Sequence, residues 1–237
     1  VPLGLRRDDL ISKDANPDDV TADRARYDAW RQRLTEVQAM GSAPSMVVTT
    51  PTQITQAKIS QPQMTQTTQN LNGQVLIEDC AVKFARPSGK RFGTLVHVLL
   101  ASVPLDATVA QVEEHSALHV KLLGATDEEQ AAARVMVVNV LKHPRLAEAR
   151  AAEAAGRRVW REVPVALRTD DGTGTPQIVD GQIDLAYETD AGWMVIDFKT
   201  DIEIATAEDA YVRQVSTYLD AVTRATGQPA TGLILKI

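Results

Sequence analysis

An acid and a lysine stand two positions apart near the end of an apolar stretch, in the run GWMVIDFKT at 192–200. Successive side chains of a β-strand point to opposite faces, so Asp197 and Lys199 would share one face. If residues 189–192 (TDAG) form the loop of a hairpin with the preceding strand, Asp184 lies directly across from Asp197, with Cβ atoms roughly 5 Å apart. Two carboxylates so placed repel each other unless a cation lies between them or one of them holds a proton.

A hard divalent cation such as Mg²⁺ suits this pair of acids, because it takes oxygen ligands at about 2.0–2.1 Å. Lys199 could then orient or help to deprotonate a metal-bound water, or stabilise charge on a reacting phosphate. Two other interpretations stay open at this point. Acids and a lysine on the outer face of a hairpin can form a solvated salt bridge. A protonated acid pair of the glycosidase type is also conceivable, although Lys199 would favour the ionised form of both acids.

The same hairpin register predicts which face of the two strands is buried. Three apolar pairs fall on one face, which we expect to be the core face: Ile183 with Phe198, Leu185 with Ile196, and Tyr187 with Met194. The opposite face carries the two aspartates and Lys199 together with Gln182, Ala186 and Val195.

The elements that must position these residues follow from the period of the apolar pattern. A period near 3.6 predicts helices at about 91–103, 107–123, 127–142, 144–155 and 207–226. A period of two predicts strands at 157–167, 177–188, 193–200 and 231–237. Helices first, then three strands, a helix and a strand, predict an α/β fold in which helices flank a mixed central β-sheet.

The N-terminal part, residues 1–78, is expected to be an extension of the compact domain at 79–237. Its helix, at about 19–40, carries a narrow apolar stripe that would pack on something else: Tyr27, Trp30, Leu34 and Val37. Residues 46–72 are rich in Thr and Gln and nearly free of charge, which is typical of a linker. The chain begins at Val1, so we expect a piece of a longer polypeptide.

The composition excludes several classes of protein. There is no apolar run of about 18 residues and no signal-like segment, so we expect a cytoplasmic protein that does not enter a membrane. Cys80 is the single cysteine, which excludes an internal disulfide and a four-cysteine metal site. A net charge of −6 argues against general coating of nucleic acid but leaves room for a local basic path. Two groups of basic residues are candidates for that path: Arg86, Lys90 and Arg91, and Arg157, Arg158 and Arg161.

Four short motifs occur in a fixed order along the C-terminal part. They are FGTLVH with His97, GQIDL with Asp184, DFK with Asp197 and Lys199, and YVRQVSTY with Gln214 and Tyr218. In this order they resemble the RecB/AddA-type nuclease domain of the PD-(D/E)xK superfamily, which is found at the C-terminus of UvrD-like DNA helicases. The resemblance covers roughly residues 86–237, and it lacks the proline of the superfamily's name because Ile183 precedes Asp184.

The resemblance implies a restriction-endonuclease-like core and assigns roles to individual residues. Asp184, Asp197 and His97 would bind the metal together with the carbonyl of Phe198, and Lys199 would be the catalytic lysine. Other residues are expected beside the site, either binding substrate or supporting the ligands: Gln214 and Tyr218, Tyr211 on the same helical stripe, and Glu162, which resembles an acid on the family's first strand. The implied cofactor is Mg²⁺ or Mn²⁺, and the implied partner is DNA.

The function that the resemblance implies is hydrolysis of phosphodiester bonds by a metal-dependent (exo)deoxyribonuclease, in DNA end processing and recombinational repair. No Walker A sequence occurs, so the motor would lie in an upstream UvrD-like region, with a partner helicase-nuclease subunit as a further candidate. Two alternatives remain at this point. One is a non-catalytic DNA-end-binding or scaffolding module derived from such a nuclease. The other is a stand-alone enzyme of this fold with a different nucleic-acid substrate.

Overall fold

The computed structural model describes five segments of the chain, at 17–50, 75–80, 87–169, 175–200 and 204–237. They belong to two compact units, one ending at Met46 and one running from Val47 to Ile237. None of the described helices has the length and apolar character that a membrane span requires.

The described part of the first unit is a single long helix, α1 (Pro17–Ser42). It confirms the helix expected at 19–40. None of its residues is buried, and the aromatic side chains of Tyr27 and Trp30 are 51% and 57% exposed. The apolar stripe therefore has no partner within the described part of its own unit.

The second unit contains every predicted helix and strand of the compact domain, with ends that shift by a few residues. Its helices are α3 (Lys90–Ser102), α4 (Val109–Leu123), α5 (Asp127–Val140), α6 (Pro144–Ala154) and α7 (Ile204–Thr226). Its strands are β1 (Val47–Thr49), β2 (Val75–Asp79), β3 (Val159–Thr169), β4 (Gln177–Thr189), β5 (Gly192–Lys199) and β6 (Ala230–Lys236).

The strands form one mixed sheet in the order β1-β4-β5-β6-β2, with β3 paired to β4. The pairs β3–β4 and β4–β5 are antiparallel, whereas β5–β6, β2–β6 and β1–β4 are parallel. Between the parallel strands β5 and β6 the chain passes through α7, the usual way to join neighbouring parallel strands. The predicted α/β fold with helices around a mixed sheet is thus confirmed.

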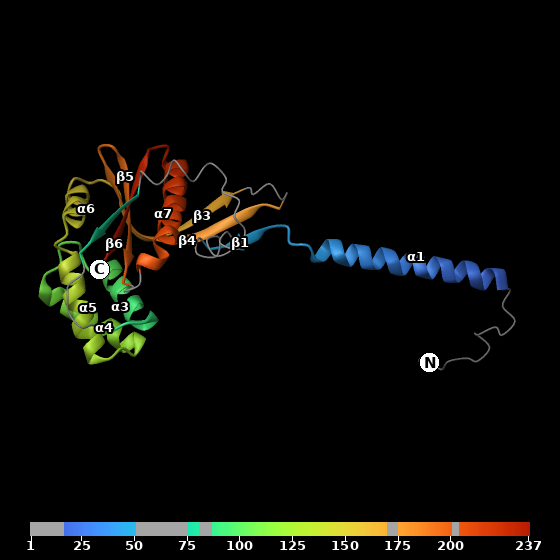
Figure 1. Ribbon diagram of the computed structural model, residues 1–237, viewed down its shortest axis with the longest axis horizontal. Helices are drawn as coiled ribbons and strands as arrows, with labels where there is room; N and C mark the ends of the chain where they lie inside the picture. The colour runs from blue at the N-terminus through green and yellow to red at the C-terminus, as the bar shows by residue number, and fades with distance from the viewer. Residues whose placement is uncertain (1–16, 51–74, 81–86, 170–174, 201–203) are drawn as a thin grey trace, which may run out of the picture. The chain divides into compact units, whose positions relative to one another are not determined.

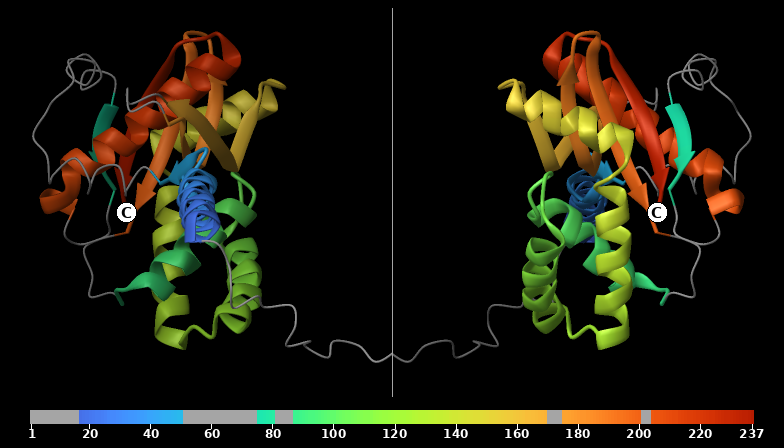
Figure 2. Two further views of the ribbon diagram at one scale, coloured as in Figure 1. Left: turned by 90° about the vertical axis from the view of Figure 1, so that its right-hand side faces the viewer. Right: turned by 90° about the vertical axis from the view of Figure 1, so that its left-hand side faces the viewer.

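Helices cover both faces of the sheet and create two cores. Figure 1 shows α6 on one side of β5 and β6 and α7 on the other, and both views of Figure 2 show α3, α4 and α5 gathered at one end of the sheet. The first core joins α3–α6 to one sheet face and includes Leu185 and Phe198. The second joins α7 to the opposite face and includes Ile183 and Val195. We call them the α3–α6 core and the α7 core.

The prediction of a single core face is therefore wrong in one respect. Leu185 and Tyr187 lie in the α3–α6 core with Ile196, as expected, but Ile183 lies in the α7 core. The opposite face is also buried rather than open to water, since Ala186 and Val195 pack under α7. The reason is local to the site and is described below.

Two strands lie N-terminal to residue 79, where the compact domain was expected to begin. β1 falls inside the stretch interpreted as a linker and pairs with residues 177–179 of β4. β2 pairs with β6 along its whole length, from Val75 to Asp79. The rest of the expected linker, residues 51–72, lies outside the described residues, as does Arg86.

Candidate active site

The predicted register of the β4–β5 hairpin is confirmed near the turn and ends just before the first aspartate. Leu185 pairs with Ile196 and Tyr187 with Met194. The expected four-residue loop at 189–192 is wrong, because Thr189 pairs with Gly192 and only residues 190–191 form the turn. Beyond Leu185 the two strands separate, so the expected pairing of Ile183 with Phe198 does not form. In its place, the backbone N–H of Phe198 donates to Oδ2 of Asp184 at 2.7 Å. The carboxylate of Asp184 thus occupies the point at which the strands part.

Strands β3 and β4 both exchange faces at this point. On β4, Ile183 packs in the α7 core and Leu185 in the α3–α6 core, although two residues apart they should share one face. On β3, Val163 packs against the α7 core and Val159 against the α3–α6 core, so the alternation changes between them as well. Glu162 has φ of +48°, a left-handed conformation that a non-glycine residue seldom adopts.

The ladder between β3 and β4 is interrupted where the faces exchange. Arg161 pairs with Leu185 and Val163 with Ile183, whereas Glu162 and Asp184 between them are not paired. Both carboxylates therefore sit on locally irregular backbone. Strained backbone of this kind is most often found at functional sites.

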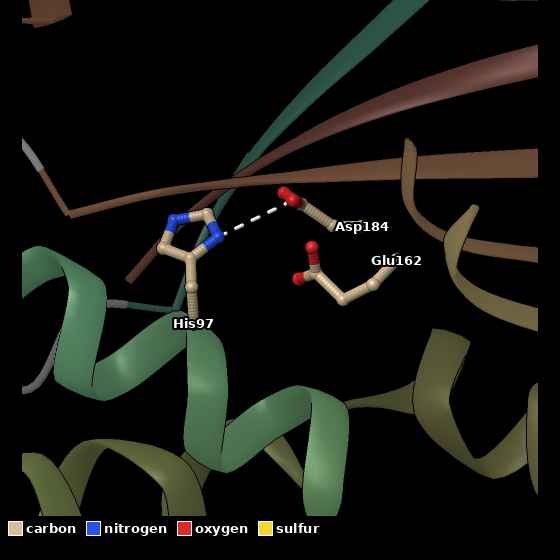
Figure 3. Close-up of side chains that lie close together, drawn as sticks. All are labelled: His97, Glu162 and Asp184. Carbon is tan, nitrogen blue, oxygen red and sulfur yellow. Dashed lines mark hydrogen bonds and ion pairs between the residues drawn. The ribbon is translucent and has the colours of Figure 1, made fainter. Parts of the chain in front are cut away.

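His97 joins these two acids from α3. Its Nδ1 lies 3.2 Å from Oδ1 of Asp184, and Figure 3 shows His97, Asp184 and Glu162 pointing toward one another from a helix and two strands. Ligand atoms of all three lie within 4.8 Å of one another. The ring of Phe198 stands edge-on to the imidazole at 6.4 Å and supports it from the sheet. We call these three residues the His97–Glu162–Asp184 cluster.

The electrostatics of the cluster show that a positive charge is favoured there. Burial alone would lower the pKa of His97, but its hydrogen bond to Asp184 and the nearby carboxylates raise that pKa. The pKa of Glu162 is raised, first by burial and then by the negative charge of Asp184. Both changes have the sign expected when acids gather without a full countercharge.

Asp197 and Lys199 form a second, adjacent part of the site. Lys199 Nζ lies 2.8 Å from Oδ2 of Asp197, and Asp197 is 3% exposed. Burial raises the pKa of Asp197 to about 6, with Asp184 adding to the increase and Lys199 opposing it. Burial would lower the pKa of Lys199, but the charge of Asp197 raises it, so the ammonium keeps its proton.

Helix α7 holds Lys199 from the other side. Gln214 Oε1 accepts from Lys199 Nζ at 3.3 Å, and Gln214 Nε2 donates to the hydroxyl of Tyr218 at 2.9 Å. The ammonium also lies 4.5 Å from the ring centroid of Tyr211, a cation–π distance. Gly181 makes room for this arrangement, because a Cβ there would lie 2.8 Å from Cε1 of Tyr218.

All predicted site residues gather in this region, although not in the arrangement that the hairpin register implied. His97 and Asp184 are in direct contact, whereas Asp197 is paired with Lys199 and lies outside the His97–Glu162–Asp184 cluster. Phe198 contributes its backbone N–H and its ring. Gly181 was missed, and the signal for it was a glycine inside a strand pattern, which often marks close approach of another group.

The residues present fit a divalent cation. Ligands on opposite sides of an ion with bonds of about 2.0–2.1 Å lie about 4 Å apart, so spacings within 4.8 Å need only a small contraction of the cluster. Oδ2 of Asp197 is buried, and its partner in the described part of the chain is the ammonium of Lys199 at 2.8 Å. That oxygen has a lone pair left for a metal. The donor set of carboxylates and one imidazole suits Mg²⁺ or Mn²⁺.

A protein-family model described as the PD-(D/E)XK nuclease superfamily matches residues 76–237, which is more than half of the chain. A search among curated proteins found no match.

Proposed function

The chain belongs to the PD-(D/E)XK nuclease superfamily, and on that premise we propose that it is a Mg²⁺-dependent deoxyribonuclease that hydrolyses DNA phosphodiester bonds. One observation carries the proposal. The His97–Glu162–Asp184 cluster, built from α3, β3 and β4, lies beside the buried Asp197–Lys199 ion pair of β5. Acids that could bind a cation and a lysine that keeps its proton thus share one site.

The metal ligands in this proposal are His97, Asp184 and Asp197, with Glu162 as a further oxygen ligand. A bound divalent ion would polarise the scissile phosphate and lower the pKa of the attacking water. The carbonyl of Phe198 remains a candidate ligand on the strength of the family resemblance.

Lys199 is assigned the role of a charged hydrogen-bond donor. Its raised pKa keeps the ammonium protonated at neutral pH, which suits stabilisation of negative charge on the phosphate and orientation of the nucleophile. It does not suit proton abstraction by a neutral amine. Gln214 and Tyr211 fix the position of the ammonium, so they are positioning residues in this scheme.

Action from a DNA end and a place in a helicase-nuclease of the RecB/AddA type are the finer parts of the proposal. They rest on the order of the motifs FGTLVH, GQIDL, DFK and YVRQVSTY. In such an assembly an upstream UvrD-like motor, and a partner helicase-nuclease subunit, would deliver DNA to this domain for end processing in recombinational repair.

The proposal is tested by incubating the purified chain with linear and circular DNA, single- and double-stranded, in Mg²⁺, Mn²⁺ or EDTA. We expect cleavage that needs the metal and is lost in Asp184→Asn and Lys199→Ala. Asp180→Asn is the matched control, because Asp180 is an exposed carboxylate on the same strand as Asp184. Preference for linear over circular DNA would support action at ends.

Metal-independent cleavage, or cleavage that persists in Asp184→Asn and Lys199→Ala, would contradict the proposal. DNA binding without any cleavage would instead favour the alternative of a non-catalytic DNA-end-binding module.

A further inference from the structure

A groove of about 550 Å³ opens directly onto the His97–Glu162–Asp184 cluster. His97 and Glu162 are among its lining residues, and so are the exposed residues Lys90 and Thr94 nearer the start of α3. Lys90 and His97 are seven residues apart on one helix, so they lie on the same face about 10 Å apart along the axis. The lining residues extend along α3 from Lys90 to Ser102, on both sides of His97.

Several residues that line the groove have short side chains. At Gly93 a Cβ would lie 3.0 Å from the hydroxyl oxygen of Thr200, so glycine lets α3 and the end of β5 approach closely. Other residues that line the groove are also small, among them Thr94, Ala101 and Ser102. The described part of the lining includes no Phe, Tyr or Trp ring on which a base could stack.

Among the described residues that line the groove, Lys90 is the only lysine or arginine. Thr94 donates its hydroxyl to the carbonyl of Lys90, so that proton is not available to a ligand. The described lining offers one ammonium, short side chains and no Phe, Tyr or Trp ring. Such a groove suits a sugar-phosphate backbone better than bases.

The other described members of the two basic groups have structural partners. Arg91 pairs with Glu129 at 3.0 Å, and Arg158 pairs with Glu188 at 3.0 Å. Arg157 pairs with Asp190, and Arg161 donates to the carbonyls of Ala101 and Val103. Of the described members of the two basic groups, Lys90 is the one that lines the groove beside the cluster.

We infer that the groove along α3 binds the backbone of a single DNA strand, with Lys90 contacting a phosphate about 10 Å along α3 from the one at the cluster. The inference rests on the proposed function for its substrate. It adds where the strand lies, which residue binds its phosphate, and why binding is independent of base sequence.

The test measures binding without chemistry. A fluorescein-labelled oligothymidylate of about 20 nucleotides exceeds the usual single-strand site size. It is titrated with the full chain in EDTA, at several salt concentrations between about 50 and 200 mM. The variants are Lys90→Ala and Lys90→Glu, with Lys121→Ala as the control because Lys121 is an exposed lysine in the last turn of α4 and does not line the groove.

We expect Lys90→Ala to weaken binding roughly three- to tenfold and to reduce the slope of log K against log salt by about 0.7, the value for one phosphate contact on a single strand. Lys90→Glu should weaken binding further, and Lys121→Ala should match wild type. Oligothymidylate, oligocytidylate and a mixed sequence should bind with equal affinity.

The groove assignment is overturned if wild type does not bind the strand, or if Lys90→Ala keeps the affinity and salt slope of wild type. It is also overturned if affinity depends strongly on base sequence. Cleavage assays separate this inference from the proposed function. Lys90-dependent binding without metal-dependent cleavage would contradict the proposed nuclease function and support the groove assignment. Metal-dependent cleavage with an unchanged KM in Lys90→Ala would support the nuclease function and contradict the groove assignment.

Discussion

The buried carboxylate of Asp197 predicts that the active site weakens the metal-free fold. In the folded chain its pKa is raised from 3.8 to about 6, because burial raises this pKa by more than the charge of Lys199 lowers it. Each pKa unit corresponds to about 1.4 kcal/mol, so the ionised carboxylate costs up to about 3 kcal/mol of folding free energy at neutral pH. Asp197→Asn resembles the protonated side chain and should remove that cost.

The sign of the pH dependence follows from the same shift. The stability contributed by a protonated Asp197 is present in full below pH 3.8 and is lost as the pH rises through about 6. The variant should therefore match wild type near pH 4 and exceed it increasingly above that. By the linkage relation the gap should be about twice as large at pH 8 as at pH 5.

Thermal unfolding followed by circular dichroism in EDTA measures this gap. At pH 8, Asp197→Asn should raise Tm by roughly 5–10 °C, since 1 kcal/mol shifts Tm by about 2–4 °C in a domain of this size. The exposed carboxylate of Asp180 gives the control Asp180→Asn, which should leave Tm unchanged. Excess Mg²⁺ should stabilise wild type more than Asp197→Asn. The reasoning would be refuted if Asp197→Asn melts at or below the wild-type temperature in EDTA at pH 8. It would also be refuted if the difference in Tm between the variant and wild type does not change with pH.

Three further predictions concern other parts of the chain. Gly181→Ala should lower Tm and activity together, because its Cβ would meet the ring of Tyr218 at 2.8 Å and overpacking typically costs about 1–3 kcal/mol; unchanged Tm would contradict this close approach. Burial and the negative charge of nearby acids raise the pKa of Cys80 to about 11. Its alkylation by iodoacetamide at pH 8 should therefore be about a hundredfold slower than that of free cysteine. Alkylation as fast as that of free cysteine would contradict the burial of this thiol beside acids. Removal of residues 1–46 should leave the Tm of the 47–237 unit within about 2 °C of the full chain by calorimetry, because they form separate compact units; a large decrease would show that the units depend on each other.

The sequence predicted the hairpin register because apolar alternation is strong on both sides of the turn. It failed at Asp184, one residue beyond the last observed pair, where the strands exchange faces and Glu162 has a left-handed backbone that no side-chain period encodes. The same irregularity explains why Asp184 turns toward His97 rather than lying opposite Asp197. The partnership with His97 could be expected only from the motif, because an apolar helix gives no sign of which face meets the sheet.

Strands β1 and β2 were missed for a different reason. Each is short, and each pairs in parallel with a strand more than a hundred residues away in the sequence. Local pattern cannot reveal such a partner. The helices, by contrast, carry their own signals, such as the capping boxes at Thr108 and Thr126 that begin α4 and α5.

The exchange of faces on β3 and β4 bears on how the domain unfolds. Each of these strands gives apolar side chains to both the α3–α6 core and the α7 core. Neither core can open without displacing β3 and β4, which also pack in the other core. Amide hydrogen exchange should therefore report one cooperative opening for β3 and β4, with the site at its centre, rather than two layers that open at different free energies.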